Sequence, residues 1–309
     1  MKIAVLSAIW PIALERLRLR HDVAVELDPP PPVLHRTLSD RRAAVIRSPV
    51  RLDRAALEAA PALRLVVRAG AGTDAVDLAC AESRGVRVVT VPSAARSVAE
   101  HAFGLLLGLF RGIPRLDRSL REGRWLKSSG GGRELRGKRL GLVGFGRIGR
   151  SLGELASAFG MQVAACDRSP EKPEKREAAK RLGVTFMGLD ELLRESDAVC
   201  VQAPLDGGSR RLLDAAKLGL MKMGAVLVHV GRGGVVDEAA LYAALREGRL
   251  AGAALDVFES EPPGESPLLS LDNFIGTPHV GAQTAEAQAA IGDEVVRILD
   301  EFALDKERP

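Results

Sequence analysis

Three side chains in the last third of the sequence have the types that proton and hydride chemistry at a small keto acid requires. Arg232, Glu261 and His279 each follow a short apolar run that predicts a strand. A guanidinium can hold a carboxylate and polarise a carbonyl, and histidine is the natural proton donor near neutral pH. A neighbouring carboxylate favours the protonated ring and fixes its orientation. We therefore interpret the three residues as a candidate catalytic set.

Each member of this set also has an ordinary structural alternative. Arg232 could cap a strand or form a surface ion pair, which contributes little to stability. Glu261 precedes Pro262 and could be a solvated loop carboxylate, while His279 follows Pro278 and could be a turn residue. Their shared position favours catalysis, because open α/β sheets bind ligands just beyond the carboxyl ends of their strands.

A second motif is a glycine-rich turn between a predicted strand, Arg139–Val143, and a predicted helix, Ile148–Phe159. The first glycine permits a tight turn, the second lets a pyrophosphate approach the backbone, and the third lets helix and strand pack closely. The helix N-terminus adds N–H groups and the positive end of a dipole. We expect a dinucleotide to contact Gly144, Gly146, Arg147, Ile148 and Gly149. A packing turn without a ligand is the alternative.

The next predicted strand, Gln162–Cys166, ends before an acidic residue suited to an adenosine ribose. Asp167 can accept hydrogen bonds from both ribose hydroxyls and would repel a 2′-phosphate, which favours NAD over NADP. Arg168 beside it would partly offset that repulsion. The choice between the two cofactors therefore stays open.

The elements that must position these residues alternate between short apolar strands and helices. Strands are expected at Lys2–Ser7, Val23–Leu27, Ala43–Ile46, Leu65–Val67, Val86–Thr90, Ala198–Ala203, Ala225–Val230, Gly252–Leu255 and Phe274–Thr277, besides the two named above. Helices are expected at Pro11–Arg20, Arg54–Ala60, Ser97–Gly112, Asp237–Glu247 and Thr284–Phe302, and a polar surface loop at Lys127–Gly132. Buried parallel strands separated by helices give this alternation, so the sequence predicts an α/β layered structure whose pattern restarts at Lys138.

The composition excludes several classes of protein. A hydrophobic content of 46% with 27% charged residues is typical of a globular chain and argues against disorder. The formal charge is +4, the basic residues are spread along the chain and only 4% are aromatic, which argues against nucleic-acid binding and suits a small anionic substrate. Cys80, Cys166 and Cys200 are widely spaced, which predicts reduced thiols and no metal site. We expect no signal peptide and no membrane segment, hence a cytoplasmic protein.

Taken together, these segments resemble the D-isomer-specific 2-hydroxyacid dehydrogenase family over nearly the whole chain. The resemblance implies two doubly wound parallel-sheet domains with a cleft between them. These would be a flavodoxin-like substrate-binding domain (residues 1–96 plus 284–309) and a Rossmann NAD-binding domain (97–283). It implies NAD as the cofactor, the Arg–Glu–His set as catalytic residues, and a homodimer formed through the Ser97–Gly112 helix and the arm that follows it. The further cofactor contacts that it implies are Pro204, Gly231, Asp256 and Gly281.

Two segments in the N-terminal part resemble segments that bind the substrate in this family. Arg68–Asp74 resembles the family loop whose backbone N–H groups receive the substrate carboxylate. Ile46–Arg51 resembles a segment of D-3-phosphoglycerate dehydrogenases in which an arginine binds the substrate phosphate. We therefore expect oxidation of D-3-phosphoglycerate to 3-phosphohydroxypyruvate, as in serine biosynthesis. The expected substrate ligands are Arg47, Arg68, Ala71 and Gly72.

Departures from the family pattern leave other functions open. Val91–Ala95 lacks the asparagine usual in this loop, and Ser128–Gly132 replaces a stretch that contains an aromatic residue. Reduction of glyoxylate or hydroxypyruvate is therefore an alternative. A NAD-sensing binding protein is a more remote one, since some relatives of this fold act as corepressors. We expect no regulatory domain of the kind that many D-3-phosphoglycerate dehydrogenases carry, and hence no serine feedback through such a domain.

The remaining histidines are not assigned to catalysis. His21 and His35 lie in polar segments that we expect to connect elements, and His101 lies on an apolar helix, where a structural role is expected. His229 ends a predicted strand at a position where the family usually has asparagine. Nothing in the sequence explains this departure.

Overall fold

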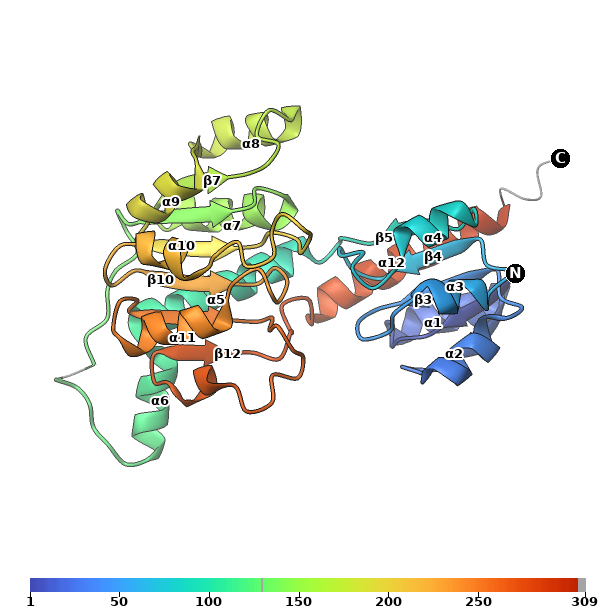
Figure 1. Ribbon diagram of the computed structural model, residues 1–309, viewed down its shortest axis with the longest axis horizontal. Coiled ribbons are helices and arrows are strands. Elements are labelled where there is room, and N and C mark those ends of the chain that lie inside the picture. The colour runs from blue at the N-terminus through green and yellow to red at the C-terminus, as the bar shows by residue number, and fades with distance from the viewer. Residues whose placement is uncertain (129, 305–309) are drawn as a thin grey trace. The chain divides into compact units, whose positions relative to one another are not determined.

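A computed structural model describes residues 1–128 and 130–304, and it divides the chain into two compact units (Figure 1). Unit 1 comprises Met1–Ala94 and the described part of Gln283–Pro309, and unit 2 comprises Ala95–Ala282. The expected loop Lys127–Gly132 is turn or irregular structure at its described residues, and Ser129 lies outside them. Each unit is built around its own parallel sheet.

Unit 1 contains a five-stranded sheet in the order β2-β1-β3-β4-β5, and every neighbouring pair is parallel. Its strands are β1 Lys2–Val5, β2 Asp22–Val25, β3 Ala43–Ile46, β4 Leu65–Arg68 and β5 Arg87–Thr90. This order is that of the flavodoxin-like doubly wound fold, whose ligand-binding switch point lies between the first and third strands. The central strands β3 and β4 are buried along their whole length, which explains why they are continuous apolar runs in the sequence.

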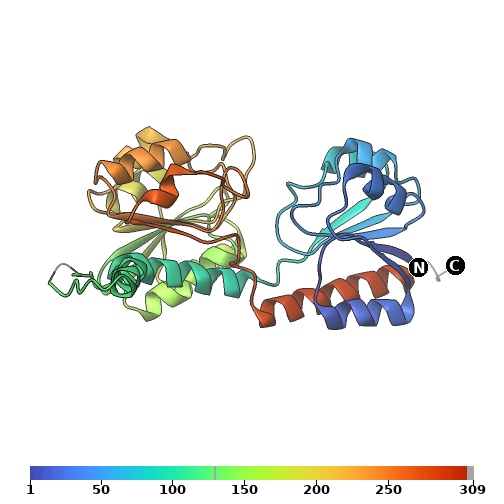
Figure 2. The same ribbon diagram turned by 90° about the horizontal axis from the view of Figure 1, so that it is seen from below.

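Helices cover both faces of this sheet (Figure 2). They are α1 Pro11–Arg20, α2 Pro31–Leu38, α3 Arg54–Glu58, α4 Leu78–Ser83 and α12 Ala285–Leu304. Side chains of α2, α3 and α4 share one core with the sheet, while α1 and α12 pack against each other on the opposite face. The two helices meet closely at Gly292, where an added Cβ would lie 2.9 Å from the Cβ atoms of Ala13 and Trp10. Only glycine leaves room for this approach.

The structure corrects the expectation for one histidine. His35 lies inside α2 and not in a connecting segment. Pro31 occupies the first turn of this helix, where its fixed φ and its missing N–H carry no penalty, so the prolines before His35 do not prevent a helix. His21, by contrast, does follow the end of α1, and its Nε2 lies 2.9 Å from Oδ1 of Asp300 on α12.

Unit 2 contains a seven-stranded parallel sheet in the order β12-β11-β10-β9-β6-β7-β8. Its strands are β6 Arg139–Val143, β7 Gln162–Cys166, β8 Thr185–Phe186, β9 Ala198–Val201, β10 Val226–His229, β11 Gly252–Leu255 and β12 Phe274–Gly276. Numbered from β6, the first six strands have the 3-2-1-4-5-6 order of the Rossmann fold, and β12 extends the sheet by one strand. The predicted class of two doubly wound parallel-sheet folds is thus confirmed.

The helices of unit 2 form two layers, one on each face of the sheet (Figure 2). One layer contains α5 Ala95–Arg111, α7 Arg147–Ala158 and α8 Pro173–Leu182, and the other contains α9 Leu189–Glu195, α10 Ala215–Leu220 and α11 Glu238–Arg246. A further helix, α6 Ile113–Arg121, follows α5 after a left-handed Gly112, and a short 3-10 turn spans Pro267–Ser270. Within residues 1–128 and 130–304, no helix is long and apolar enough to cross a membrane.

Because the strands of unit 2 are parallel, their carboxyl ends meet at one edge of the sheet. The residues that follow β6, β7, β10, β11 and β12 therefore come together there, although they are far apart in the sequence. This edge contains the glycine turn and all three members of the predicted catalytic set.

Candidate active site

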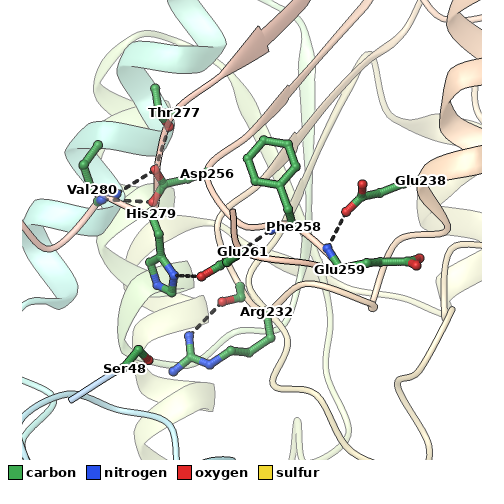
Figure 3. A network of polar contacts seen from close by, with 12 residues as sticks. Ser48, Arg232, Glu238, Asp256, Phe258, Glu259, Glu261, Thr277, His279 and Val280 are labelled. Carbon is green, nitrogen blue, oxygen red and sulfur yellow. Dashed lines mark hydrogen bonds and ion pairs between the residues drawn. The ribbon is translucent and has the colours of Figure 1, made fainter. Parts of the chain in front are cut away.

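A histidine and a glutamate form the centre of the site (Figure 3). Nδ1 of His279 lies 2.8 Å from Oε2 of Glu261. Because an ionised carboxylate can only accept, Nδ1 carries the hydrogen and donates it, which leaves Nε2 as the ring atom available for proton transfer. The other oxygen of Glu261 accepts from the backbone N–H of Phe258 at 3.2 Å, so the carboxylate is held at both ends.

The electrostatics of the pair favour an ionised glutamate. Burial acts to raise the pKa of Glu261. The hydrogen bond and the charge of His279 lower this pKa, and the nearby charge of Arg232 lowers it as well. The net result is a pKa below the ordinary value. Glu261 is therefore a carboxylate throughout the neutral range and can stabilise a protonated imidazole.

Arg232 lies beside this pair on the loop that follows β10 (Figure 3). Its side chain is half-buried, and its Nη1 donates to the carbonyl of Gly231 at 2.8 Å. Gly231 itself is packed so closely that an added Cβ would lie 2.6 Å from the carbonyl oxygen of Ala203. The structure thus brings together the three predicted catalytic side chains in unit 2.

A buried carboxylate holds the loop that carries His279. Asp256, directly after β11, accepts at Oδ1 from the Thr277 hydroxyl at 2.6 Å and from the N–H of Val280 at 2.9 Å, and at Oδ2 from the N–H of Gly281 at 2.9 Å. His101 of α5 lies 3.3 Å from Oδ1 and also donates to Thr277. The expected contact of Asp256 with the cofactor stays a prediction, because its carboxylate is occupied by these groups of its own chain.

The glycine turn is built to receive a phosphate. Gly144 has φ +100°, which favours glycine, and a Cβ on Gly149 would lie 2.4 Å from the carbonyl oxygen of Gly144. A Cβ on Gly146 would meet no atom within 4 Å and would therefore fill the open space above the turn. Arg147 and Ile148 follow as the first residues of α7, and the helix N-terminus points its N–H groups toward this space. These residues fit the pyrophosphate of a dinucleotide.

Sequence reasoning missed a residue that braces this turn. Gln202 follows β9 at the switch point of the sheet, and its Nε2 donates to the carbonyl of Gly144 at 2.6 Å. The predicted cofactor contact Pro204 lies two residues further along the same loop. A polar residue directly after a fully apolar strand was the available signal.

Asp167 lies at the end of β7, as predicted, but it is already engaged by its own chain. Its side chain is 8% exposed. Oδ2 accepts from the N–H of Phe145 at 2.7 Å, while Oδ1 accepts from the N–H of Ser169 at 2.8 Å and from Nζ of Lys175 at 2.5 Å. Burial acts to raise the pKa of Asp167, but Lys175 and the two amides hold it below its ordinary value. Lys175, which comes from α8, was not predicted to contact Asp167.

The predicted substrate ligands all lie in unit 1, at the carboxyl ends of β3 and β4. Arg47 follows β3 at the switch point of that sheet, where its backbone N–H donates to Oγ of Ser7 after β1 at 3.0 Å. Its Nη1 donates to Oε1 of Gln288 on α12 at 2.5 Å. Burial lowers the pKa of its guanidinium, which remains far above neutrality. Arg47 thus places a half-buried cation at a position where this fold binds ligands.

Arg68 has a different environment. It is 6% exposed, its Nη2 donates to Oγ of Ser48 at 3.1 Å and its Nη1 to the carbonyl of Ala69 at 3.3 Å. Its guanidinium packs against Gly70, where a Cβ would lie 2.1 Å from Nη1. These contacts show Arg68 supporting the loop that contains Ala71 and Gly72, so its role as a direct ligand stays a prediction.

The cysteines and the acidic residues give no second site. All three cysteines are free; Cys80 and Cys200 are buried and Cys166 is partly exposed. In the part of the chain that the structure describes, no group of three or more histidine, cysteine or acidic residues could hold a metal ion.

Comparison with known proteins agrees with this geometry. Residues 103–281 match the model of the D-isomer specific 2-hydroxyacid dehydrogenase family, NAD binding domain. The chain belongs to this family. The matched range lies within unit 2, which is therefore the NAD-binding unit.

Individual relatives cover most of the chain. It is 43% identical to a hydroxypyruvate reductase of Thermotoga maritima over 84% of each protein. It is also 43% identical to a D-3-phosphoglycerate dehydrogenase of Methanocaldococcus jannaschii over 82% of this chain, but the chain spans only 48% of that relative's length. Among solved structures, an NAD-dependent formate dehydrogenase from Staphylococcus aureus in complex with NAD has a TM-score of 0.85 and 32% identity, over 98% of this chain and 96% of its own.

The ion pair between Lys175 and Asp167 should make the chain discriminate less strongly against NADP than an unpaired carboxylate would. Removing the ammonium in Lys175→Met leaves an uncompensated carboxylate beside the expected 2′-position. We expect the ratio of kcat/KM for NADH to that for NADPH to rise about tenfold, because a 2′-phosphate is then repelled more strongly. Steady-state kinetics with both cofactors measures the ratio. Lys180→Met, at an exposed lysine of the same helix, is the matched control. An unchanged ratio in a folded Lys175→Met variant contradicts the prediction.

Proposed function

We propose that this chain is an NAD-dependent D-2-hydroxyacid dehydrogenase whose substrate is D-3-phosphoglycerate, oxidised to 3-phosphohydroxypyruvate as in serine biosynthesis. The observation that carries the proposal is the hydrogen-bonded pair of His279 and Glu261 beside Arg232, at the strand edge that also holds the glycine turn. A proton acceptor, its orienting carboxylate and a cation for the substrate carboxylate are what oxidation of a 2-hydroxy acid requires.

Each residue of the set has a defined part in the reaction. Arg232 binds the substrate carboxylate and polarises the C2 oxygen through its guanidinium. Nε2 of His279 takes the proton of the C2 hydroxyl, because Nδ1 is committed to Glu261. Glu261 stabilises the imidazolium that forms and keeps the ring oriented. NAD, when bound, supplies the acceptor for the hydride that leaves C2, and keto-acid reduction runs through the same groups in reverse.

The phosphorylated substrate is supported by the basic residues of unit 1. Arg47 places a guanidinium at the switch point of its sheet, and a planar bidentate cation suits a phosphate. The relatives named D-3-phosphoglycerate dehydrogenase agree with this choice. Hydroxypyruvate or glyoxylate is the alternative, and it is favoured by the hydroxypyruvate reductase that matches 84% of both chains.

We also propose that the chain forms a homodimer and acts in the cytoplasm. Apolar side chains on and after α6 support the dimer, because Ile113, Leu120 and Trp125 are 54%, 59% and 77% exposed. Large exposed apolar groups gathered in one segment are typical of an association surface. The three free cysteines agree with a reducing compartment.

A substrate panel tests the function directly. NADH oxidation with 3-phosphohydroxypyruvate should exceed that with hydroxypyruvate, glyoxylate and pyruvate in kcat/KM. In Arg47→Met this preference should fall about tenfold or more, because a charge-assisted contact to the phosphate is lost. Arg51→Met, at an exposed arginine of the same segment, should keep it. Equal kcat/KM with all four acids would overturn the proposed substrate. No turnover with any one of the four would overturn the proposed enzymatic function.

The histidine–glutamate pair predicts a shift in pH dependence. In keto-acid reduction His279 must be protonated, so the rate falls as pH rises. In Glu261→Gln the imidazolium loses its counter-charge, and the fall should move to lower pH by about one unit. The pH profile of kcat/KM measures this, with Glu259→Gln at a neighbouring exposed carboxylate as the control. A profile that does not move would remove Glu261 from this role.

His279→Ala should lower turnover about 10²–10⁴-fold with NADH binding retained.

The dimer predicts a defined response to charge on α6. Light scattering of the native chain should give the mass of two chains. Leu120→Glu places a carboxylate in the proposed surface and should shift the mass toward one chain. Leu19→Glu, at an apolar residue of α1 that is 85% exposed, should leave it unchanged. A single-chain mass for the native protein contradicts the dimer.

A further inference from the structure

A buried histidine next to the site has no part in the mechanism above. His229 is the last residue of β10, three residues before Arg232, and it is 1% exposed. Its ring makes three polar contacts. Nε2 lies 2.8 Å from the carbonyl oxygen of Arg232, Nδ1 lies 3.2 Å from the carbonyl oxygen of Val201, and the N–H of Gly231 points to Nδ1 at 3.4 Å. A buried polar group with this many contacts has a definite hydrogen-bonding arrangement.

The contacts determine which nitrogen carries the hydrogen. The carbonyl of Val201 already accepts the N–H of Val230 at 3.0 Å, so it does not depend on the ring. Gly231 offers an N–H to Nδ1, which can accept it only when Nδ1 is unprotonated. The shorter contact, from Nε2 to the carbonyl of Arg232, is then the donated one. Burial, with Arg232 nearby, lowers the pKa of His229, which keeps the ring neutral.

From this arrangement we infer that His229 is a positioning residue for Arg232. The neutral ring accepts from the N–H of Gly231 and donates to the carbonyl of Arg232, so it holds the backbone on both sides of the Arg232 Cα. The guanidinium itself is tied back to the Gly231 carbonyl at 2.8 Å. Backbone and side chain of the arginine are thus fixed relative to the end of β10. A shift of about 1 Å in a substrate-orienting cation can cost about 10²-fold in rate.

The inference rests on the proposed role of Arg232 as the ligand of the substrate carboxylate. Two substitutions of similar length separate the hydrogen bond from the volume of the ring. His229→Gln keeps an amide donor at the reach of Nε2, whereas His229→Met keeps the length and has no donor. We expect His229→Met to lower kcat/KM for the preferred keto acid about 10- to 100-fold and to leave the Kd for NADH within about twofold. His229→Gln should recover most of the loss. Equal activity of His229→Met and the native chain would overturn the inference.

A double-mutant cycle distinguishes positioning from a general structural defect. If His229 acts through the guanidinium of Arg232, His229→Met should add no further loss of kcat/KM in an Arg232→Ala background. A loss as large as in the native background would overturn the inference. Absence of turnover by the native chain with every keto acid would instead overturn the proposed function, so the two failures are distinguishable.

A measurement on the native chain covers the case in which His229→Met does not fold. Long-range ¹⁵N–¹H spectra of histidine-labelled protein report the protonated nitrogen of each ring. We expect one ring to be the neutral Nε2–H tautomer at pH 7, and we expect its signals to be absent from folded His229→Gln. An Nδ1–H or doubly protonated ring for His229 at pH 7 would overturn the arrangement.

Discussion

The geometry of the site depends on the hydrogen bonds that the buried carboxylate of Asp256 accepts. This carboxylate is buried, and removing a charge from water is costly unless hydrogen bonds replace the lost hydration. Here the replacing groups come from the loop after β12 and from His101 of α5, so the charge stays buried only when that loop is in place. The loop includes His279, whose φ of +54° is uncommon for a residue with a side chain. One buried charge thus holds the backbone that presents the histidine.

The same principle is repeated along the edge of the sheet in unit 2. Two residues expected to contact a ligand are supported by a side chain at a strand end: Gly144 by Gln202, which follows the neighbouring strand β9, and Arg232 by His229, the last residue of β10 itself. His229 is buried and Gln202 is partly buried, and both lie at the ends of apolar strands. Hydrogen bonds from side chains that are themselves packed restrict the backbone of the loops that they contact. A site built in this way is preorganised for the charges that develop in the reaction.

Much of this arrangement could be predicted from the sequence. Parallel strands buried on both faces are apolar runs, so eleven of the twelve described strands were located closely and the α/β class followed, whereas the two-residue strand β8, Thr185–Phe186, was not predicted. The glycine turn and the Arg–Glu–His set were singled out because they follow predicted strands, at the edge where open α/β sheets bind ligands. The sequence failed where local patterns mislead. Helix α2 was not predicted; its first turn contains Pro31, which suits a loop as well as a helix start. Helix α6 was not predicted either; it begins after the left-handed Gly112 and has Pro114 in its first turn.

What the sequence determined by itself is the chemistry available: which side chains follow which strands, and that they suit a dinucleotide and a hydroxy acid. What only the tertiary structure decided is which of those side chains are already engaged. Asp167 has Lys175 as its partner, Arg68 supports its own loop, and Asp256 is saturated by the loop of His279. The partners lie between one and 24 residues away in the sequence, and the hydrogen bonds form because folding brings the groups within about 3 Å of each other. No residue spacing can predict them, because the crossing of helices and strands sets which groups meet.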